Sequence, residues 1–271
     1  MVQLIRPLNL ILVLCGVVLG AWLTRMDQPV DWIGTLLAAL ALASVAAAGN
    51  VHNDLRDLEA DRVNRPDRPL PSGRVSLRTA RLMGGVLLGA SFVLGAMVSL
   101  RHLGALVGIA LLLWLYNRWL KHRPLIGNLV VAGLVTLSLP FARLDTPLGP
   151  ALWVAMVFAF VLNLIRELVK DAEDADGDSG VGSRTLAVLV GTRRVRSGVQ
   201  VLLAGTLIAL PAPAVLPAFA GTWLLTCIPA AVFLALALAG TVGEGFPAPR
   251  ASRHVKMAMV FGLLALTVSV R

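Results

Sequence analysis

Nine apolar stretches constrain the fold of this chain more than any other feature of its sequence. Each is close to the roughly 20 residues that a helix needs to cross the hydrocarbon core of a bilayer. They cover about residues 8–24, 32–53, 78–99, 102–119, 125–142, 148–170, 186–210, 216–240 and 254–270. With 57% hydrophobic residues and a mean hydropathy of +0.81, the chain is too apolar for an ordinary soluble protein. The sequence therefore predicts an all-α fold, a polytopic membrane bundle of nine transmembrane helices that forms a single domain over residues 1–271.

The Lys and Arg residues predict how this bundle lies in the membrane, because cytoplasmic loops collect basic residues. With the N-terminus in the cytoplasm, the basic residues placed outside are only Arg25, Arg101, Arg143 and Arg271. Most acidic residues also fall on the cytoplasmic side, in segments 54–67 and 167–178. We expect an integral, multi-pass protein of the cytoplasmic membrane whose active site opens to the cytoplasm.

The first acidic segment directly follows the second apolar stretch. A continuous helix would carry four of its side chains on one face, namely Asn50, Asp54, Asp57 and Asp61. Carboxylates this close repel one another and lose solvation at a membrane edge, so the arrangement needs cations. The hard cation Mg²⁺ typically takes one or two carboxylates and keeps its other positions for water and substrate phosphates. This segment is therefore a candidate Mg²⁺ site.

A second segment repeats the spacing of three and then four residues, at Asp171, Asp174 and Asp178. Two such helix ends that face each other could hold two or more metal ions, and a diphosphate would complete the coordination. The same helix end also carries Asn163, Arg166, Glu167 and Lys170. Ionisable residues at membrane depth are functional candidates by default, so we include this helix end in the predicted site.

Three further segments contain polar residues that allow both a functional and a structural interpretation. The loop at 64–74, which includes Arg65, has three prolines and a glycine that favour a stiff, extended cover. Its arginines suit phosphate oxygens, although the positive-inside bias also explains their charge. Tyr116 and Lys121 lie at a predicted interface, where anchoring competes with a substrate role. Asn128 lies just inside an apolar stretch, where such groups more often bond a neighbouring helix than a ligand.

The net charge of +9 does not indicate a nucleic-acid partner. The basic residues flank helix ends, and no soluble domain or interleaving of aromatic and basic residues accompanies them. Anionic lipid headgroups and a phosphorylated substrate are the expected partners, and no protein partner is inferred.

Three runs of residues together form a recognisable pattern. They are Asn53-Asp54-x-x-Asp57-x-x-x-Asp61, Asn64-Arg65-Pro66-x-Arg68-Pro69-Leu70-Pro71-Ser72-Gly73, and Lys170-Asp171-x-x-Asp174-x-x-Gly177-Asp178. This pattern resembles the UbiA superfamily of intramembrane prenyltransferases. The segment from Arg166 to Asp174 is most similar to the branch that attaches a second geranylgeranyl chain to a phosphoglycerol lipid.

The resemblance implies a mechanism and a role for each matching residue. Mg²⁺ held by both acidic segments would bind a polyprenyl diphosphate, and the acceptor would attack the carbocation left when the diphosphate departs. The implied metal site comprises Asn53, Asp54, Asp57, Asp61, Asp171, Asp174 and Asp178. Arg65, Lys121 and Lys170 would contact the diphosphate, and Tyr116 and Asn128 would lie near the reacting end of the substrate. We also expect Asn50 and Arg166 to contribute to substrate binding.

Two alternative functions remain at this point. Members of the same superfamily also prenylate aromatic acceptors in quinone and pigment synthesis. A function of another class, ion-coupled transport, would use the acidic segments as a cation site. Transporters usually place such sites near the membrane midplane, whereas both segments are predicted here at one face.

Overall fold

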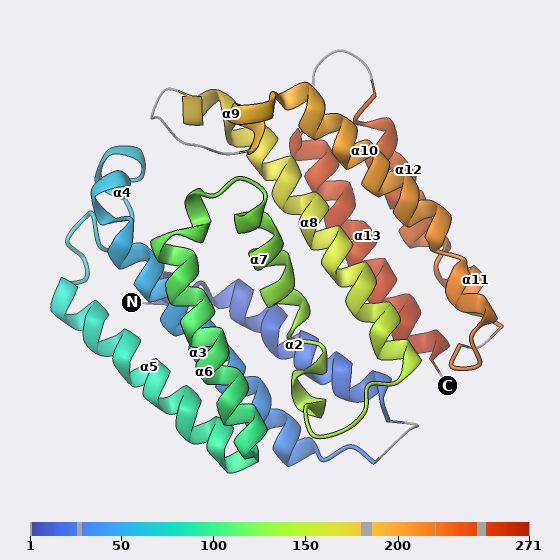
Figure 1. The fold of residues 1–271 in the computed structure, drawn as a ribbon, viewed down its shortest axis with the longest axis horizontal. Coiled ribbons are helices and arrows are strands. Elements are labelled where there is room, and N and C mark those ends of the chain that lie inside the picture. Colours follow the sequence, from blue (N-terminus) through green and yellow to red (C-terminus); the bar gives the residue numbers. More distant parts are fainter. Residues whose placement is uncertain (1, 26–28, 180–185, 220, 243–247, 271) are drawn as a thin grey trace. The chain divides into compact units, whose positions relative to one another are not determined.

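The structure is a computed structural model that describes residues 2–25, 29–179, 186–219, 221–242 and 248–270. The side chains of His122, of residues 174–179 and of residues 248–249 lie outside this description. The described residues form α- and 3₁₀-helices joined by turns, with one isolated β-bridge between Phe219 and Val270 (Figure 1). The predicted all-α fold class is therefore confirmed.

Six of the described helices are long and apolar enough to cross a membrane. They span Trp32–Arg56, Leu77–Val98, Leu100–Arg118, Pro150–Glu173, Thr192–Val215 and Arg250–Ser269. Three shorter apolar helices cover Pro7–Leu23, Ile126–Thr136 and Ile228–Ala239. These helices identify the chain as an integral membrane protein.

The chain folds into two compact units. Unit 1 comprises residues 1–21, 29–119 and 138–147. Its elements are α1 (Val2–Ile5), most of α2 (Pro7–Leu23), α3 (Trp32–Arg56), α4 (Leu58–Asn64), α5 (Leu77–Val98), α6 (Leu100–Arg118) and η2 (Pro140–Arg143). Helix α3 packs against both α5 and α6 (Figure 1). It buries several alanines between Ala38 and Ala48. Small side chains of this kind let helix backbones approach closely.

Unit 2 comprises residues 22–28, 120–137 and 148–271. Its elements are η1 (Leu120–His122), α7 (Ile126–Thr136), α8 (Pro150–Ser179), α9 (Leu186–Val190), α10 (Thr192–Ala209), η3 (Ala212–Val215), α11 (Trp223–Thr226), α12 (Ile228–Ala239) and α13 (Ala248–Ser269). Helix α8 packs against α7, α10 and α13, and α12 packs against α10 and α13. Within this unit α8 is therefore the common neighbour of helices from distant parts of the sequence.

Three of the predicted helices are interrupted, each at or beside a glycine or a proline. Gly191 has a φ of +86°, which a glycine adopts readily, and it separates α9 from α10. Pro140 begins η2, so the predicted stretch 125–142 is not one helix. Pro229 lies in the first turn of α12, so the stretch 216–240 is also divided. Helices α2, α5 and α6 begin and end close to the bounds of the predicted stretches 8–24, 78–99 and 102–119.

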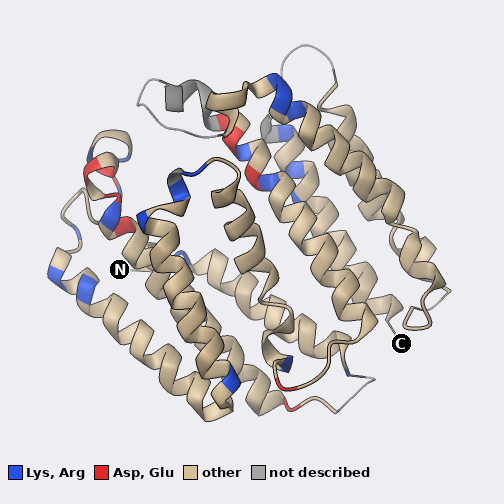
Figure 2. Ribbon diagram, viewed as in Figure 1, with Lys and Arg blue, Asp and Glu red and all other residues tan. Residues whose placement is uncertain are grey.

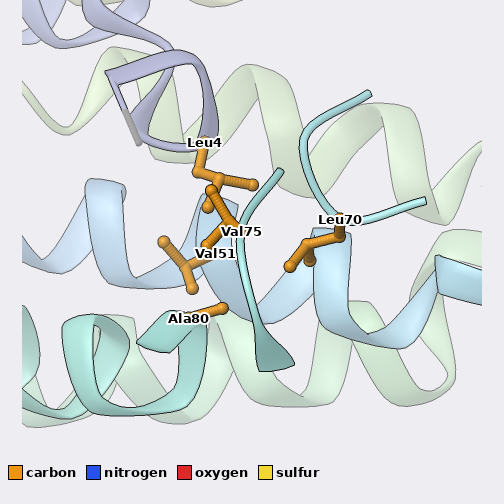
Figure 3. Close-up of a cluster of buried hydrophobic side chains, with 5 residues drawn as sticks. All are labelled: Leu4, Val51, Leu70, Val75 and Ala80. Carbon is orange, nitrogen blue, oxygen red and sulfur yellow. The ribbon is translucent and has the colours of Figure 1, made fainter. Parts of the chain in front are cut away.

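A cluster of buried side chains fixes the N-terminal segment and the proline-rich loop against α3. It contains Leu4, Val51, Leu70, Val75 and Ala80, which converge from four segments of the chain (Figure 3). Leu4 and Val51 are completely buried. The cluster therefore holds residues 4–6 and 68–75 beside the end of α3, where the first acidic segment begins.

The loop at 65–75 is compact, so the prediction of an extended cover was wrong. The amides of Ser72 and Val75 donate to the carbonyls of Arg68 and Pro69, both at 3.0 Å. Gly73 takes a φ of +73°, which closes the turn. The prolines do stiffen this segment, but the backbone hydrogen bonds fold it back on itself.

Candidate functional site

The first acidic segment is bent, because α3 ends at Arg56 and α4 begins at Leu58. Asp57 lies between them with φ of −86° and ψ of 3°, outside the helical range. The predicted single helix through Asp61 is therefore wrong, and the four predicted side chains do not form one straight row. Figure 2 shows acidic and basic residues gathered at this junction.

Asp54 and Asp61 remain together after the bend, and both are buried. Asp54 Oδ1 accepts a hydrogen bond from Arg6 Nη2 at 2.7 Å. Arg68 Nη1 donates to Asp61 Oδ2 at 2.6 Å and lies 3.9 Å from Asp54 Oδ1. One guanidinium group of Arg68 therefore faces both carboxylates.

The asparagines of this segment bind protein groups in the structure. Asn53 Nδ2 donates to Asp57 Oδ2 at 3.0 Å, which orients that carboxylate. Asn50 Nδ2 donates to the carbonyl of Ile5 at 3.1 Å and so ties α1 to α3. Their predicted roles in metal and substrate binding stay predictions, and the structure gives each asparagine a supporting role.

Arg6 was not among the predicted site residues. The sequence contains one signal for it, because a buried Asp54 needs a counter-ion and Arg6 lies just before the first apolar stretch. Its position depends on a φ of +54° between α1 and α2, an unusual value for a residue other than glycine. That conformation cannot be read from the sequence pattern.

In unit 2, Asp171 is fixed by a residue from another helix. Asn128 Nδ2, on α7, donates to Asp171 Oδ2, on α8, at 2.8 Å. Asn128 therefore bonds a neighbouring helix, and its predicted position near the reacting end of the substrate stays a prediction. Arg166 Nη2 pairs with the adjacent Glu167 at 3.1 Å, and Lys170 is exposed at the same helix end.

The other predicted residues are less fully described. Helix α8 continues through Asp174 and Asp178, whose side chains lie outside the described part of the structure. Tyr116 is half-buried near the end of α6, and Lys121 lies in η1. Arg65 is exposed at the end of α4.

The donors of unit 1 suit a hard divalent cation. Among the described residues, no group of three or more His, Cys, Asp or Glu side chains is placed to hold a metal ion. A pair suffices for Mg²⁺, which typically takes one or two carboxylates and completes its coordination with water and phosphate. Asp54 and Asp61 already turn oxygens toward one cationic group, so this pair fits the ion.

These features define a class of protein: an α-helical integral membrane protein with carboxylates gathered at helix ends. The family model described as the UbiA prenyltransferase family matches residues 10–269. The chain belongs to this family and is a prenyltransferase. Membership sets aside the alternative of an ion-coupled transporter.

Known relatives agree with this assignment over nearly the full chain. Digeranylgeranylglyceryl phosphate synthase of Methanopyrus kandleri is 36% identical over 270 residues, which cover 98% of this chain and 97% of the relative. A solved structure from a study of digeranylgeranylglyceryl phosphate synthase in membranes is similar with a TM-score of 0.79 and 30% identity, covering 98% of this chain and 95% of that one. A UbiA homologue from Archaeoglobus fulgidus, bound to DMAPP and Mg²⁺, shares the fold with a TM-score of 0.63 and 19% identity, and 98% of each chain is covered.

Proposed function

We propose that this protein transfers a geranylgeranyl group from its diphosphate to a phosphoglycerol lipid, in a reaction that depends on Mg²⁺. The observation that carries this proposal is the 36% identity to the Methanopyrus kandleri digeranylgeranylglyceryl phosphate synthase over 98% of the chain. The Mg²⁺ dependence is supported by the carboxylate pair of unit 1 and by the A. fulgidus homologue bound to DMAPP and Mg²⁺.

The proposed roles of the side chains follow from their chemistry. The aspartates of both acidic segments would hold Mg²⁺, with Asn53 and Asn128 orienting Asp57 and Asp171. Arg65, Lys121 and Lys170 bind the diphosphate oxygens, because cationic donors stabilise phosphate charge. When bound, Mg²⁺ neutralises the negative charge that develops on the leaving diphosphate.

The reaction itself needs no protein nucleophile. The allylic C–O bond breaks, and its electron pair leaves with the diphosphate. A hydroxyl oxygen of the lipid acceptor then forms an ether bond to the allylic carbon and releases its proton. The chain's contribution is to bind and orient both substrates and to exclude water, which would otherwise capture the carbocation.

We also propose a single domain of nine membrane-crossing helices with the N-terminus in the cytoplasm. Six long helices and three shorter apolar ones support this number, and one family model covers residues 10–269. The distribution of Lys and Arg supports the orientation, with the acidic segments opening to the cytoplasm.

A product assay with purified protein tests the function. Mg²⁺ and geranylgeranyl diphosphate would be supplied with geranylgeranylglyceryl phosphate and 4-hydroxybenzoate side by side. We expect prenylated phosphoglycerol lipid only, and no product with EDTA. Product from 4-hydroxybenzoate alone would instead establish an aromatic acceptor, and turnover in EDTA would exclude the role of Mg²⁺.

A further inference from the structure

Arg68 occupies the position between Asp54 and Asp61 where the proposed function requires a metal ion. Its Nη1 atom lies 2.6 Å from Asp61 Oδ2 and 3.9 Å from Asp54 Oδ1. Arg6 contacts the same Asp54 Oδ1 at 2.7 Å. The two guanidinium charges thus balance the two carboxylate charges, and a divalent cation would have to replace positive charge already present.

The backbone of Arg68 is fixed, whereas its side chain retains freedom. Its amide donates to the carbonyl of Arg65 at 3.0 Å, and its carbonyl accepts from the amide and the hydroxyl of Ser72 at 3.0 and 2.7 Å. The nearby Leu70 is anchored in the buried cluster. The side chain of Arg68 is 27% exposed, so its guanidinium can turn away from the carboxylates without moving the loop.

Arg6 is held differently. Its side chain is 35% exposed, and it contacts Asp54 but not Asp61 among the ion pairs of the described residues. Exposure does not distinguish the two arginines, but the departure of Arg6 alone would leave Arg68 beside both carboxylates. Of the two arginines, Arg68 is the one whose departure opens a position shared by both carboxylates.

We propose that Arg68 is a resident counter-ion that Mg²⁺ displaces from Asp54 and Asp61, and that the released guanidinium then binds the diphosphate. This inference rests on the proposed function. Without diphosphate, Arg68 competes with the metal for the carboxylates. With diphosphate present, the released Arg68 gains a bidentate anionic partner, so metal and diphosphate favour each other's binding through this residue.

The substitution Arg68→Gln should change two affinities in opposite directions. Binding of Mn²⁺ alone, followed by the electron paramagnetic resonance signal of the free ion, should become tighter because its competitor is gone. Binding of Mn²⁺ together with a non-reactive geranylgeranyl thiolodiphosphate should become weaker. Each change should be about fivefold or more, the lower range of a typical coupling between two sites.

The matched control is Arg62→Gln. Arg62 Nη1 pairs with Glu59 at 2.8 Å on the same short helix, but both side chains are largely exposed, at 55% and 81%. This substitution removes the same charge at the same end of unit 1 and should leave both affinities unchanged. If Arg68→Gln shifts both affinities in the same direction, or neither, the inference is overturned.

A second measurement on the unaltered protein keeps the test independent of variant folding. Phenylglyoxal modifies accessible guanidinium groups, and mass spectrometry can quantify modification of Arg68 and Arg62 separately. Mg²⁺ alone should raise the modification of Arg68, and adding the thiolodiphosphate should lower it again, while Arg62 stays constant. Equal modification of Arg68 with and without Mg²⁺ would contradict the exchange.

These outcomes separate the inference from the proposed function. Unaltered protein that makes product with Mg²⁺ but shows no exchange at Arg68 would overturn only the inference. Protein that binds neither the metal nor the thiolodiphosphate would overturn both.

Discussion

Asn128 donates a hydrogen bond from Nδ2 to Asp171 Oδ2 at 2.8 Å, joining residues 43 positions apart on α7 and α8. The carboxylate is thereby held in one orientation before any ligand binds. A partner that orients a metal-binding group typically contributes about 10- to 100-fold to metal affinity or activity. Unit 1 contains a similar hydrogen bond, in which Asn53 orients Asp57.

Asn128→Ala should therefore raise the Mg²⁺ concentration needed for half-maximal turnover by about 10-fold or more. Turnover at saturating Mg²⁺ should fall less, because the carboxylate itself remains. The measurement is product formation over a range of Mg²⁺ concentrations. Gln200→Ala is the control, because Gln200 Nε2 donates to the carbonyl of Thr241 at 2.9 Å in the same unit. An equal change of Mg²⁺ requirement in both variants would rule out a specific role for Asn128.

Asp171→Ala should reduce turnover by about 100-fold or more, because the proposed site uses this carboxylate to hold the metal at the leaving group. Turnover and thermal unfolding in detergent should be measured together, and the unfolding temperature should change little. Glu59→Gln removes a carboxylate that is 81% exposed and should leave turnover unchanged. Near-normal turnover of the Asp171 variant would exclude this residue from the site.

Leu4→Ala should destabilise unit 1 by about 2–5 kcal/mol, the usual cost of such a truncation in a packed core. Leu4 is completely buried in the cluster that also contains Val51 and Leu70. Because α1 positions Arg6 beside Asp54, turnover should fall as well. Thermal unfolding and product formation provide the measurements.

Val2→Ala is the corresponding control, since Val2 on the same short helix is 66% exposed. It should change neither quantity. If Leu4→Ala left the unfolding temperature unchanged, the buried cluster would not be what fixes α1.

Gly20→Ala should be strongly destabilising, because its Cβ would overlap the backbone carbonyl oxygen of Leu139. A backbone atom cannot move aside as a flexible side chain can. Gly85→Ala should be neutral or stabilising, since a Cβ there meets nothing within 4 Å and alanine is favoured over glycine inside helices. Thermal unfolding of the two variants compares them directly, and equal unfolding temperatures would contradict the close contact at Gly20.

The class of fold and the residues available for the site can be predicted from the sequence alone. Apolar stretches of membrane-crossing length are local features, and their burial in lipid does not depend on how the helices pack. The spacing of Asp54, Asp57 and Asp61 was likewise sufficient to indicate a cation site, and the motifs were specific enough for the family to be recognised.

The partner that each charged group takes depends on the packing of segments that are distant in the sequence. Arg6 and Asp54 are 48 residues apart, and their contact depends on the packing of Leu4 and on a backbone angle that no periodicity predicts. The bend at Asp57 likewise left Asp54 and Asp61 facing Arg68. Pairing between distant residues is set by the packing of several segments at once, whereas the helical pattern of a sequence reports only on neighbours within a few turns.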